Sequence, residues 1–161
     1  MRSKPEVGQA RRRRRLAAAV KESLRDLRVQ LALLNHRVGA RVDLKDVDLD
    51  CLDLVNRHGP LSPSAIAQRA GLHPATMTGI LDRLERGGWV VRERDQADRR
   101  AVLVTPVRER NGELLRQYAG MNSLMDEICA GYSEAELELL ADFLRRAAAA
   151  GSDATGRLAA G

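Results

Sequence analysis

Apolar residues recur along the chain at helical spacing, and the first such pattern lies near the N-terminal end. Its members are Val20, Leu24, Leu27, Leu31, Leu34 and Val38. Steps that alternate between four and three residues place side chains on one face of an α-helix. The spacing predicts a helix that begins at Leu16 and stops at Gly39. A stripe this regular needs a long partner helix.

A second stripe with the same rhythm lies in the C-terminal half. Its members are Leu114, Tyr118, Met121, Met125, Ile128 and Tyr132. The spacing predicts a long helix capped by the pair Thr105 and Pro106, with Gly120 or Gly131 bending or ending it. A final helix is expected from the Ser-x-x-Glu capping box at residues 133–136, closing at Gly151.

The central part of the chain carries start and stop signals for shorter helices. One helix is expected from Asp46 to Arg57. Ser62 followed by Pro63, and His73 followed by a second proline, each pair a capping side chain with a proline at the first helical position. These two helices are separated by a turn at Gly71. The second of them is expected to end at the glycines 87 and 88.

Residues 89–94 and 101–105 alternate between apolar and polar side chains, and a polar segment that includes two adjacent arginines connects them. This pattern predicts two antiparallel strands. The fold class expected is therefore mainly α with a small β-hairpin wing, in which a winged helix-turn-helix is flanked by helical regions. The order of helix, turn, helix and basic hairpin is more specific than any of its parts.

Charge is distributed unevenly along the chain. Residues 1–15 carry seven basic side chains against one acid, a net charge of +6, while the whole chain carries +5. The remaining residues sum to −1, so general basicity cannot bring the folded part to a polyanion. The first fifteen residues are poor in large apolar side chains and are predicted to form a basic disordered tail. No apolar run approaches the ~20 residues of a bilayer span, so we expect a cytoplasmic protein that has no membrane partner.

Candidate chemistry for an enzyme, a metal site or a cofactor is absent from the sequence. There is no Gly-rich phosphate loop, no nucleophile elbow and no cluster of cysteines and histidines. Asp48, Asp50 and Asp53 are interpreted as the solvated face of a helix. Cys51 and Cys129 lie in apolar contexts and are interpreted as buried structural thiols, with redox sensing as the alternative.

The helix that follows His73 has the side chains that DNA recognition requires. Its buried face is expected to be Met77, Ile80, Leu81 and Leu84, and the opposite face offers small, hydroxylated and basic residues. Hydroxyl groups and methyl groups near a helix N-terminus suit close approach to bases and phosphates. A pair of ordinary small helices, and hairpin arginines that only protect a sheet edge, are the alternative interpretations.

The segments at residues 72–92 and 95–106 closely resemble the MarR family of bacterial transcription regulators, including an Asp-x-Arg wing signature at Asp98 and Arg100. The resemblance covers roughly residues 44–106. It implies that residues 74–86 form a recognition helix in the major groove. It also implies that Arg100 enters the minor groove, oriented by a salt bridge to Asp98. The residues expected to contact double-stranded DNA are Ser62, His73, Pro74, Ala75, Thr76, Thr78, Gly79, Arg83, Arg86, Arg94, Asp98, Arg99 and Arg100.

The resemblance also implies how the chain is organised. A basic tail (residues 1–15) precedes an N-terminal dimerisation helix (16–43) and the winged helix-turn-helix domain (44–105). C-terminal dimerisation helices (106–150) and a flexible tail (151–161) follow. The function implied is that of a homodimeric regulator that binds a palindromic operator, represses transcription and is released by a small ligand.

Alternatives remain at two points. A set of residues near the helix junctions is a candidate lining for a small-molecule effector site: His36, Cys51, Tyr118 and Met121. Aliphatic stripes at this spacing are more often part of the core, which is the alternative interpretation of these residues. The alternative function is a winged-helix protein-interaction module, of the antirepressor kind, that does not bind DNA. The basic wing argues against it.

Overall fold

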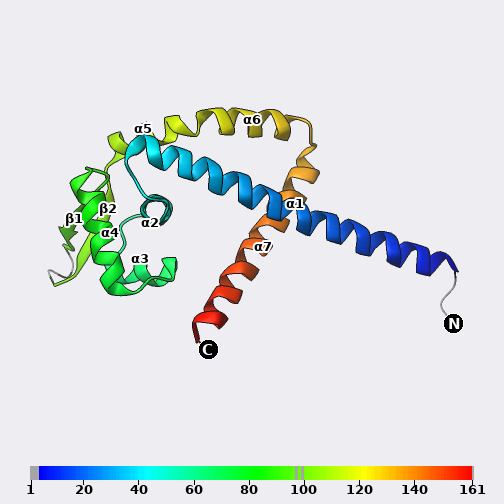
Figure 1. Cartoon of the computed structure of the whole chain (residues 1–161), viewed down its shortest axis with the longest axis horizontal. Helices are drawn as coiled ribbons and strands as arrows, with labels where there is room; N and C mark the ends of the chain where they lie inside the picture. Colours follow the sequence, from blue (N-terminus) through cyan, green and yellow to red (C-terminus); the bar gives the residue numbers. More distant parts are fainter. Residues whose placement is uncertain (1–3, 97, 99, 161) are drawn as a thin grey trace. The chain divides into compact units, whose positions relative to one another are not determined.

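The computed structural model describes residues 4–96, 98 and 100–160, and the chain divides into two compact units, Met1–Asp46 and Val47–Gly161. The expected fold class is confirmed. Helices dominate the described part of the chain, and its one sheet is an antiparallel pair of strands (Figure 1).

The first unit is a single long helix, α1 (Lys4–Val42). It begins twelve residues before the expected start at Leu16, so the prediction of disorder is wrong for residues 4–15. The physical reason is that arginine, alanine and glutamine are good helix formers. A charged composition argues against burial but does not argue against a helix. Residues 1–3 of the predicted tail lie outside the described residues.

The C-terminal end of α1 is set by Asp43 and not by Gly39. The helix continues three residues past this glycine, and Asp43 then adopts a left-handed conformation with φ 56°. The N–H of Leu44 donates to the carbonyl of Gly39 at 2.9 Å. This is the pattern of a Schellman motif with aspartate in place of the usual glycine, and aspartate tolerates that conformation better than most residues.

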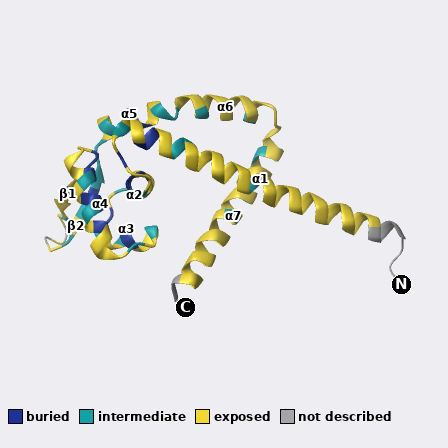
Figure 2. Ribbon diagram, viewed as in Figure 1, coloured by how far each residue is buried: buried dark blue, intermediate teal, exposed yellow. Residues whose placement is uncertain are grey.

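The second unit is built around five elements: α2 (Asp46–His58), α3 (Pro63–Ala70), α4 (Pro74–Arg86), β1 (Val90–Arg94) and β2 (Val102–Pro106). Figure 2 shows buried residues in these elements. The largest apolar side chains with almost no exposed surface are Leu52, Val55, Ile66, Met77, Ile80, Leu81, Leu84, Trp89, Val90 and Val104. The predicted buried face of α4 is confirmed. Each such side chain contributes about 1.5–3 kcal/mol of transfer free energy, so this aliphatic core is the main source of stability.

The sheet gains a third, very short partner that the sequence pattern did not predict. β1 and β2 pair so that Arg92 lies opposite Val104. Leu61 forms an isolated bridge to Val104, with N···O distances of 3.2 and 2.8 Å for its two hydrogen bonds. This bridge attaches the segment before α3 to the wing, which limits how far the hairpin can move away from the helices.

The turn from α4 into the sheet is shaped by Trp89. A Cβ on Gly87 would lie 2.7 Å from Cδ1 of the Trp89 ring, so only glycine fits beside the indole. Arg110 lies over the ring with its Cζ 4.4 Å from the ring centroid, and its Nε donates to the carbonyl of Gly87 at 3.3 Å. A cation over tryptophan adds on the order of 1 kcal/mol. These contacts fix the position of β1 relative to α4.

The predicted long C-terminal helix is divided into two shorter ones. These are α5 (Arg108–Gln117) and α6 (Ala119–Ala130), which meet at Tyr118. The break therefore comes at a tyrosine and not at Gly120. The expected cap at residues 105–106 is also wrong, because both belong to β2. Val107 precedes α5 without a side-chain cap, and its N–H is satisfied by the carbonyl of Trp89 at 3.0 Å.

The last helix, α7 (Glu134–Ala160), runs past Gly151. The prediction of a flexible tail is therefore wrong for residues 151–160, and residue 161 lies outside the described residues. A glycine inside a helix costs only about 1 kcal/mol relative to alanine, and alanines 147–150 precede it. The predicted capping box is confirmed, since the N–H of Ser133 donates to Oε2 of Glu136 at 2.9 Å.

Much of the apolar surface of α6 and α7 is exposed. In Figure 2 both helices are drawn almost entirely as exposed, and α6 has no buried residue. The large apolar side chains involved include Met125, Ile128, Leu139, Leu140, Phe143 and Leu144, which are between 40% and 69% exposed. No helix in the described part of the chain combines the length and apolarity that crossing a bilayer requires.

Candidate nucleic-acid interface

The first helix of the helix-turn-helix is capped as the sequence predicted. Oγ of Ser62 accepts the N–H of Ala65 at 3.2 Å, and Pro63 occupies the first helical position. The helix ends at Gly71, whose φ of 65° is in the left-handed region that glycine adopts without strain. Ser62 was predicted to contact DNA, and that stays a prediction; its oxygen already serves as the helix cap.

The second helix, α4, begins with a histidine cap. Nδ1 of His73 accepts the N–H of Ala75 at 3.2 Å, so the neutral ring carries its proton on Nε2. Nε2–H is then a donor at the N-terminal end of α4. This is where the helix dipole and the unpaired N–H groups favour an anion. The arrangement therefore suits a phosphate oxygen.

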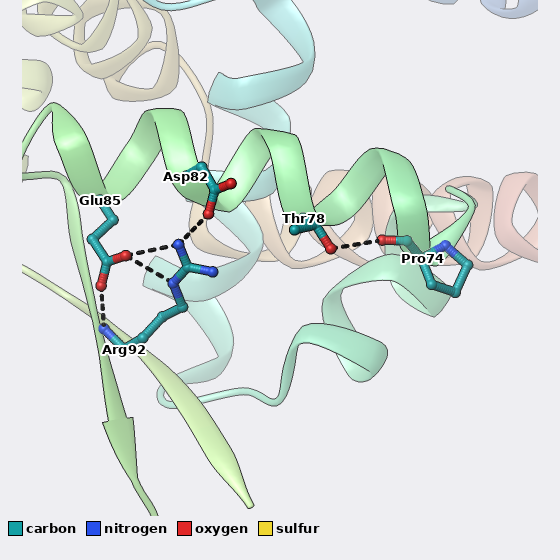
Figure 3. A network of polar contacts seen from close by, with 5 residues as sticks. All are labelled: Pro74, Thr78, Asp82, Glu85 and Arg92. Carbon is teal, nitrogen blue, oxygen red and sulfur yellow. Dashed lines mark hydrogen bonds and ion pairs between the residues drawn. The ribbon is translucent and has the colours of Figure 1, made fainter.

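The first two turns of α4 present a small, polar surface. Pro74, Ala75, Thr76 and Thr78 are exposed, and Gly79 is half-buried. Oγ1 of Thr78 donates to the carbonyl of Pro74 at 3.3 Å, which leaves the hydroxyl oxygen as an acceptor (Figure 3). The exposed side chains of the first turn are short, so its backbone can come close to a groove, while the Arg83 guanidinium reaches back to Gly79 in the second turn. Arg86 is exposed at the other end of the helix.

Arg83 is used inside the protein. Its Nε and Nη2 donate to the two carboxylate oxygens of Asp48 on α2, at 3.0 and 2.6 Å. The hydrogen bonds to Asp48 raise the pKa of the Arg83 guanidinium further above its usual range. The prediction that Arg83 contacts DNA stays a prediction. Any such contact would come from Nη1, which lies near Gly79.

Asp48 corrects the interpretation of the acids on α2 as a solvated face. Asp50 and Asp53 are exposed, but Asp48 is only 1% exposed. The signal was present in the sequence, because Asp48 lies four residues before Leu52 and seven before Val55, on the apolar face of α2. A carboxylate on that face requires a cation or hydrogen-bond donors.

Arg92 on β1 joins the wing to α4. Its Nε donates to Oε2 of Glu85 at 2.9 Å, its backbone N–H donates to Oε1 of Glu85 at 3.3 Å, and its Nη2 bonds to Asp82 (Figure 3). The hydrogen bonds to Asp82, and then those to Glu85, raise the pKa of the Arg92 guanidinium. The cation thus offsets two carboxylates that would otherwise repel a phosphate backbone from this helix.

Sequence reasoning did not single out Arg92. The available signal was an acid pair three residues apart near the end of α4, followed within ten residues by an arginine on the next strand. The strand alternation places Arg92 and Arg94 on the same side of β1. Arg94 is exposed, and Arg92 is half-buried under its two partners.

The wing is closed by backbone hydrogen bonds and by Asp98. Oδ1 of Asp98 accepts the backbone N–H of Arg100 at 3.0 Å. The expected salt bridge between these two side chains is wrong for the described residues, since Asp98 fixes the backbone of Arg100 and not its guanidinium. A carboxylate reaching the N–H two residues on is a common turn geometry. Arg100 is exposed, and Arg99 lies outside the described residues.

The four candidate ligand-lining residues have different surroundings. His36, in the first unit, has Nδ1 3.4 Å from Oδ1 of Asp46. Cys51 is fully buried, and burial raises the pKa of its thiol to about 11. Tyr118 and Met121 are half-buried at the junction of α5 and α6. Ligand binding by this set stays a prediction.

Comparison with known proteins identifies the family. The model of the MarR family matches residues 44–102, which covers α2, α3, α4 and most of the wing. The HTH-type transcriptional regulator YcgE of Bacillus subtilis is 30% identical over 124 residues, spanning 77% of this chain and 80% of that protein. The chain belongs to the MarR family. It is a helix-turn-helix transcriptional regulator, as the sequence predicted.

Two further relatives extend the comparison. The HTH-type transcriptional repressor YetL of Bacillus subtilis is 31% identical over 84 residues, 52% of this chain and 50% of that protein. A MarR family protein from Bacillus stearothermophilus has a similar fold, with a TM-score of 0.67 and 18% identity over 86% of this chain and 97% of that chain. The fold shared with other MarR family members thus includes the helices that flank the winged helix-turn-helix.

Proposed function

We propose that this MarR family regulator binds a palindromic operator as a homodimer and represses transcription from it. The observation that carries the proposal is the attachment of the wing to the exposed helix α4 by Arg92. Its guanidinium is held by Asp82 and Glu85 of that helix. A helix and a hairpin held together can enter neighbouring grooves as one piece. Ordering them on DNA then costs little entropy.

In this proposal the first turns of α4 lie in the major groove. Their exposed threonines supply hydroxyl groups for bases or phosphates, and Ala75 and the threonine methyls suit the methyl group of thymine. The N-terminal end of the helix, with Nε2–H of His73, lies against a phosphate. Arg86, at the other end, adds a phosphate contact.

The wing supplies the second contact, in the minor groove. Arg100 is exposed at the hairpin, and Asp98 fixes its backbone. A guanidinium in a narrow minor groove is attracted by the negative potential concentrated there, without a base-specific hydrogen-bond pattern. Arg94 on β1 is also exposed and adds a second positive charge that the negative potential of the groove attracts.

The dimer is supported by apolar surface that one chain leaves exposed. On α1 the stripe residues Val20, Leu27 and Leu31 are 39–43% exposed, and α6 and α7 expose the larger set described above. Helices that each expose several large apolar side chains are typical of protein interfaces. One helix-turn-helix contacts a single half-site, whereas a dimer contacts two half-sites separated by about one helical turn of DNA. The repressor role is supported by the likeness to YetL.

Selection from random-sequence duplex DNA tests the proposal. We expect the purified protein to enrich a palindrome whose half-sites are spaced by about ten base pairs, one helical turn. The Arg92→Gln variant provides the control, because it should enrich the same half-site more weakly. If the selection enriches no sequence, the result would instead favour the alternative function, a winged-helix protein-interaction module that does not bind DNA. A reporter gene placed behind the selected operator then distinguishes repression from activation.

A further inference from the structure

The N-terminal part of α1 carries an isolated run of positive charge. Five consecutive arginines occupy positions 11–15. The structure makes them part of a continuous helix, and each of them is exposed. At about 1.5 Å per residue, the run lies roughly 40 Å along the helix axis from Val42. The arginines are therefore held on a rod and not on a random coil.

No acidic neighbour offsets this charge within the helix. Side chains three or four residues apart are neighbours on a helix surface, and residues 7–21 contain no aspartate or glutamate. By contrast, Arg57 pairs with Asp53, and Arg145 and Arg146 both lie near Asp142. Within the run, Arg11 and Arg15 are themselves helical neighbours and repel each other. This segment thus has a high local positive charge, and binding an anion would reduce the repulsion between its arginines.

The geometry of the run favours a nucleic acid over other anionic partners. Successive residues of a helix are rotated by about 100°, so five in a row point in all directions. Residues 8–15 contain no large apolar side chain, so the segment lacks the apolar face with which a helix enters a membrane surface. A flat acidic protein surface would use only one side of the helix. A phosphate backbone attracts any side of it.

We propose that residues 11–15 of α1 form a second, sequence-independent DNA contact, separate from α4 and the wing. The choice of DNA as the polyanion rests on the proposed function. Two or three of the five arginines can face one duplex at a time, because the others point away from it. The contact raises affinity for operator and non-operator DNA equally, and it leaves the preference between them unchanged.

The test is the salt dependence of DNA binding. In the variant with Gln at positions 11–15, the helix is kept because glutamine is also a good helix former, which circular dichroism checks. Each lost phosphate contact lowers the slope of log affinity against log salt by about 0.9. We therefore expect the slope to fall by about 2–3 on random-sequence duplex DNA, with the ratio of operator to random affinity unchanged. An unaltered slope would overturn the proposal.

A matched pair of double variants isolates position from charge. Arg11→Gln with Arg15→Gln should lower the slope by about 1–2, whereas Arg145→Gln with Arg146→Gln on α7 should leave it unchanged. Equal effects from both pairs would overturn the proposal in favour of net charge alone. Binding of the wild type, and not the five-residue variant, to anionic phospholipid vesicles with no change in the DNA slope would also overturn it. If the wild type binds neither operator nor random DNA, the proposed function itself has failed.

Discussion

Arg83 and Asp48 lie 35 residues apart in the sequence and are joined by two hydrogen bonds, of 3.0 and 2.6 Å. The pair connects α4 to α2 within the second unit. Its two members are unequally covered, since the Arg83 side chain is 37% exposed and that of Asp48 only 1% exposed. If the pair is broken, water can hydrate the Arg83 guanidinium in place of the lost hydrogen bonds. Water cannot reach the buried carboxylate of Asp48 in the same way.

This asymmetry predicts unequal costs for removing the two partners. Arg83→Met leaves a buried carboxylate without its cation and should lower the free energy of unfolding by about 3 kcal/mol or more. Asp48→Asn leaves a guanidinium that solvent reaches and should cost about 1–2 kcal/mol. Urea unfolding followed by the fluorescence of Trp89, the only tryptophan, measures both.

Arg86→Met is the control for this experiment, because Arg86 is an exposed arginine on the same helix. It should change stability by no more than about 0.5 kcal/mol. Equal costs for Arg83→Met and Asp48→Asn, or a larger cost for Asp48→Asn, would contradict the view that burial of the carboxylate governs this pair.

The contact between Arg92 and Glu85 makes a prediction that opposes simple electrostatics. Glu85→Gln removes a negative charge from α4, the helix proposed to face DNA, so charge alone predicts tighter DNA binding. If Arg92 holds the wing to α4 through Glu85, the same change should weaken operator binding by up to about 1 kcal/mol, the limit for a partly exposed ion pair. Fluorescence anisotropy with the selected operator determines the sign. A double-mutant cycle with Arg92→Gln checks that the loss comes from this pair, and tighter binding by Glu85→Gln would refute the positioning role.

Arg100 should contribute to DNA affinity without contributing to folding. It is exposed, and the hydrogen bond to Asp98 uses its backbone N–H, which every residue except proline supplies. Arg100→Ala should therefore cost about 1–3 kcal/mol of operator affinity and leave the unfolding curve and the oligomeric state unchanged. A gel-shift titration together with sedimentation measures these quantities. Undiminished operator affinity would exclude the wing contact.

The features that the sequence predicted well are the helix caps, which depend on residues close together in the chain. The cap of Ser62 on Ala65, the cap of His73 on Ala75 and the pair Ser133 and Glu136 each span two or three residues, so spacing alone identifies them. These contacts place the starts of α3, α4 and α7. The ends of α1 and α7 were predicted less well, because a glycine permits a stop without requiring one, and these helices continue past Gly39 and Gly151.

The contacts that assemble the site were not predictable in the same way. The partners of Arg83 and Arg92 depend on which helix packs beside which, and the register of a hairpin decides which side of β1 meets α4. The first twelve residues of α1 were missed for another reason. Charge and low apolar content indicate that a segment does not pack, and they were taken to indicate that it does not fold, although a helix satisfies its own backbone hydrogen bonds.

Cys51 predicts a pH dependence of stability in the alkaline range. Burial, and then the nearby carboxylates of Asp50 and Asp48, raise the pKa of its thiol from 9.0 to about 11. Between these values the folded protein binds more protons than the unfolded chain, so the free energy of unfolding falls as pH rises. The contribution of the protonated Cys51 thiol to the free energy of unfolding is fully present below about pH 9. It decreases by on the order of 2 kcal/mol towards pH 11.

The variant Cys51→Ala isolates this contribution from other groups that titrate at high pH. Its small cavity lowers stability at every pH, but it lacks the thiol whose ionisation destabilises the fold. The stability difference between wild type and Cys51→Ala should therefore narrow between pH 9 and 11. Cys129→Ala serves as the comparison, because it removes a thiol that lies outside this core. If the stability difference between wild type and Cys51→Ala stays constant between pH 9 and 11, burial does not raise the pKa of this thiol and the prediction is wrong.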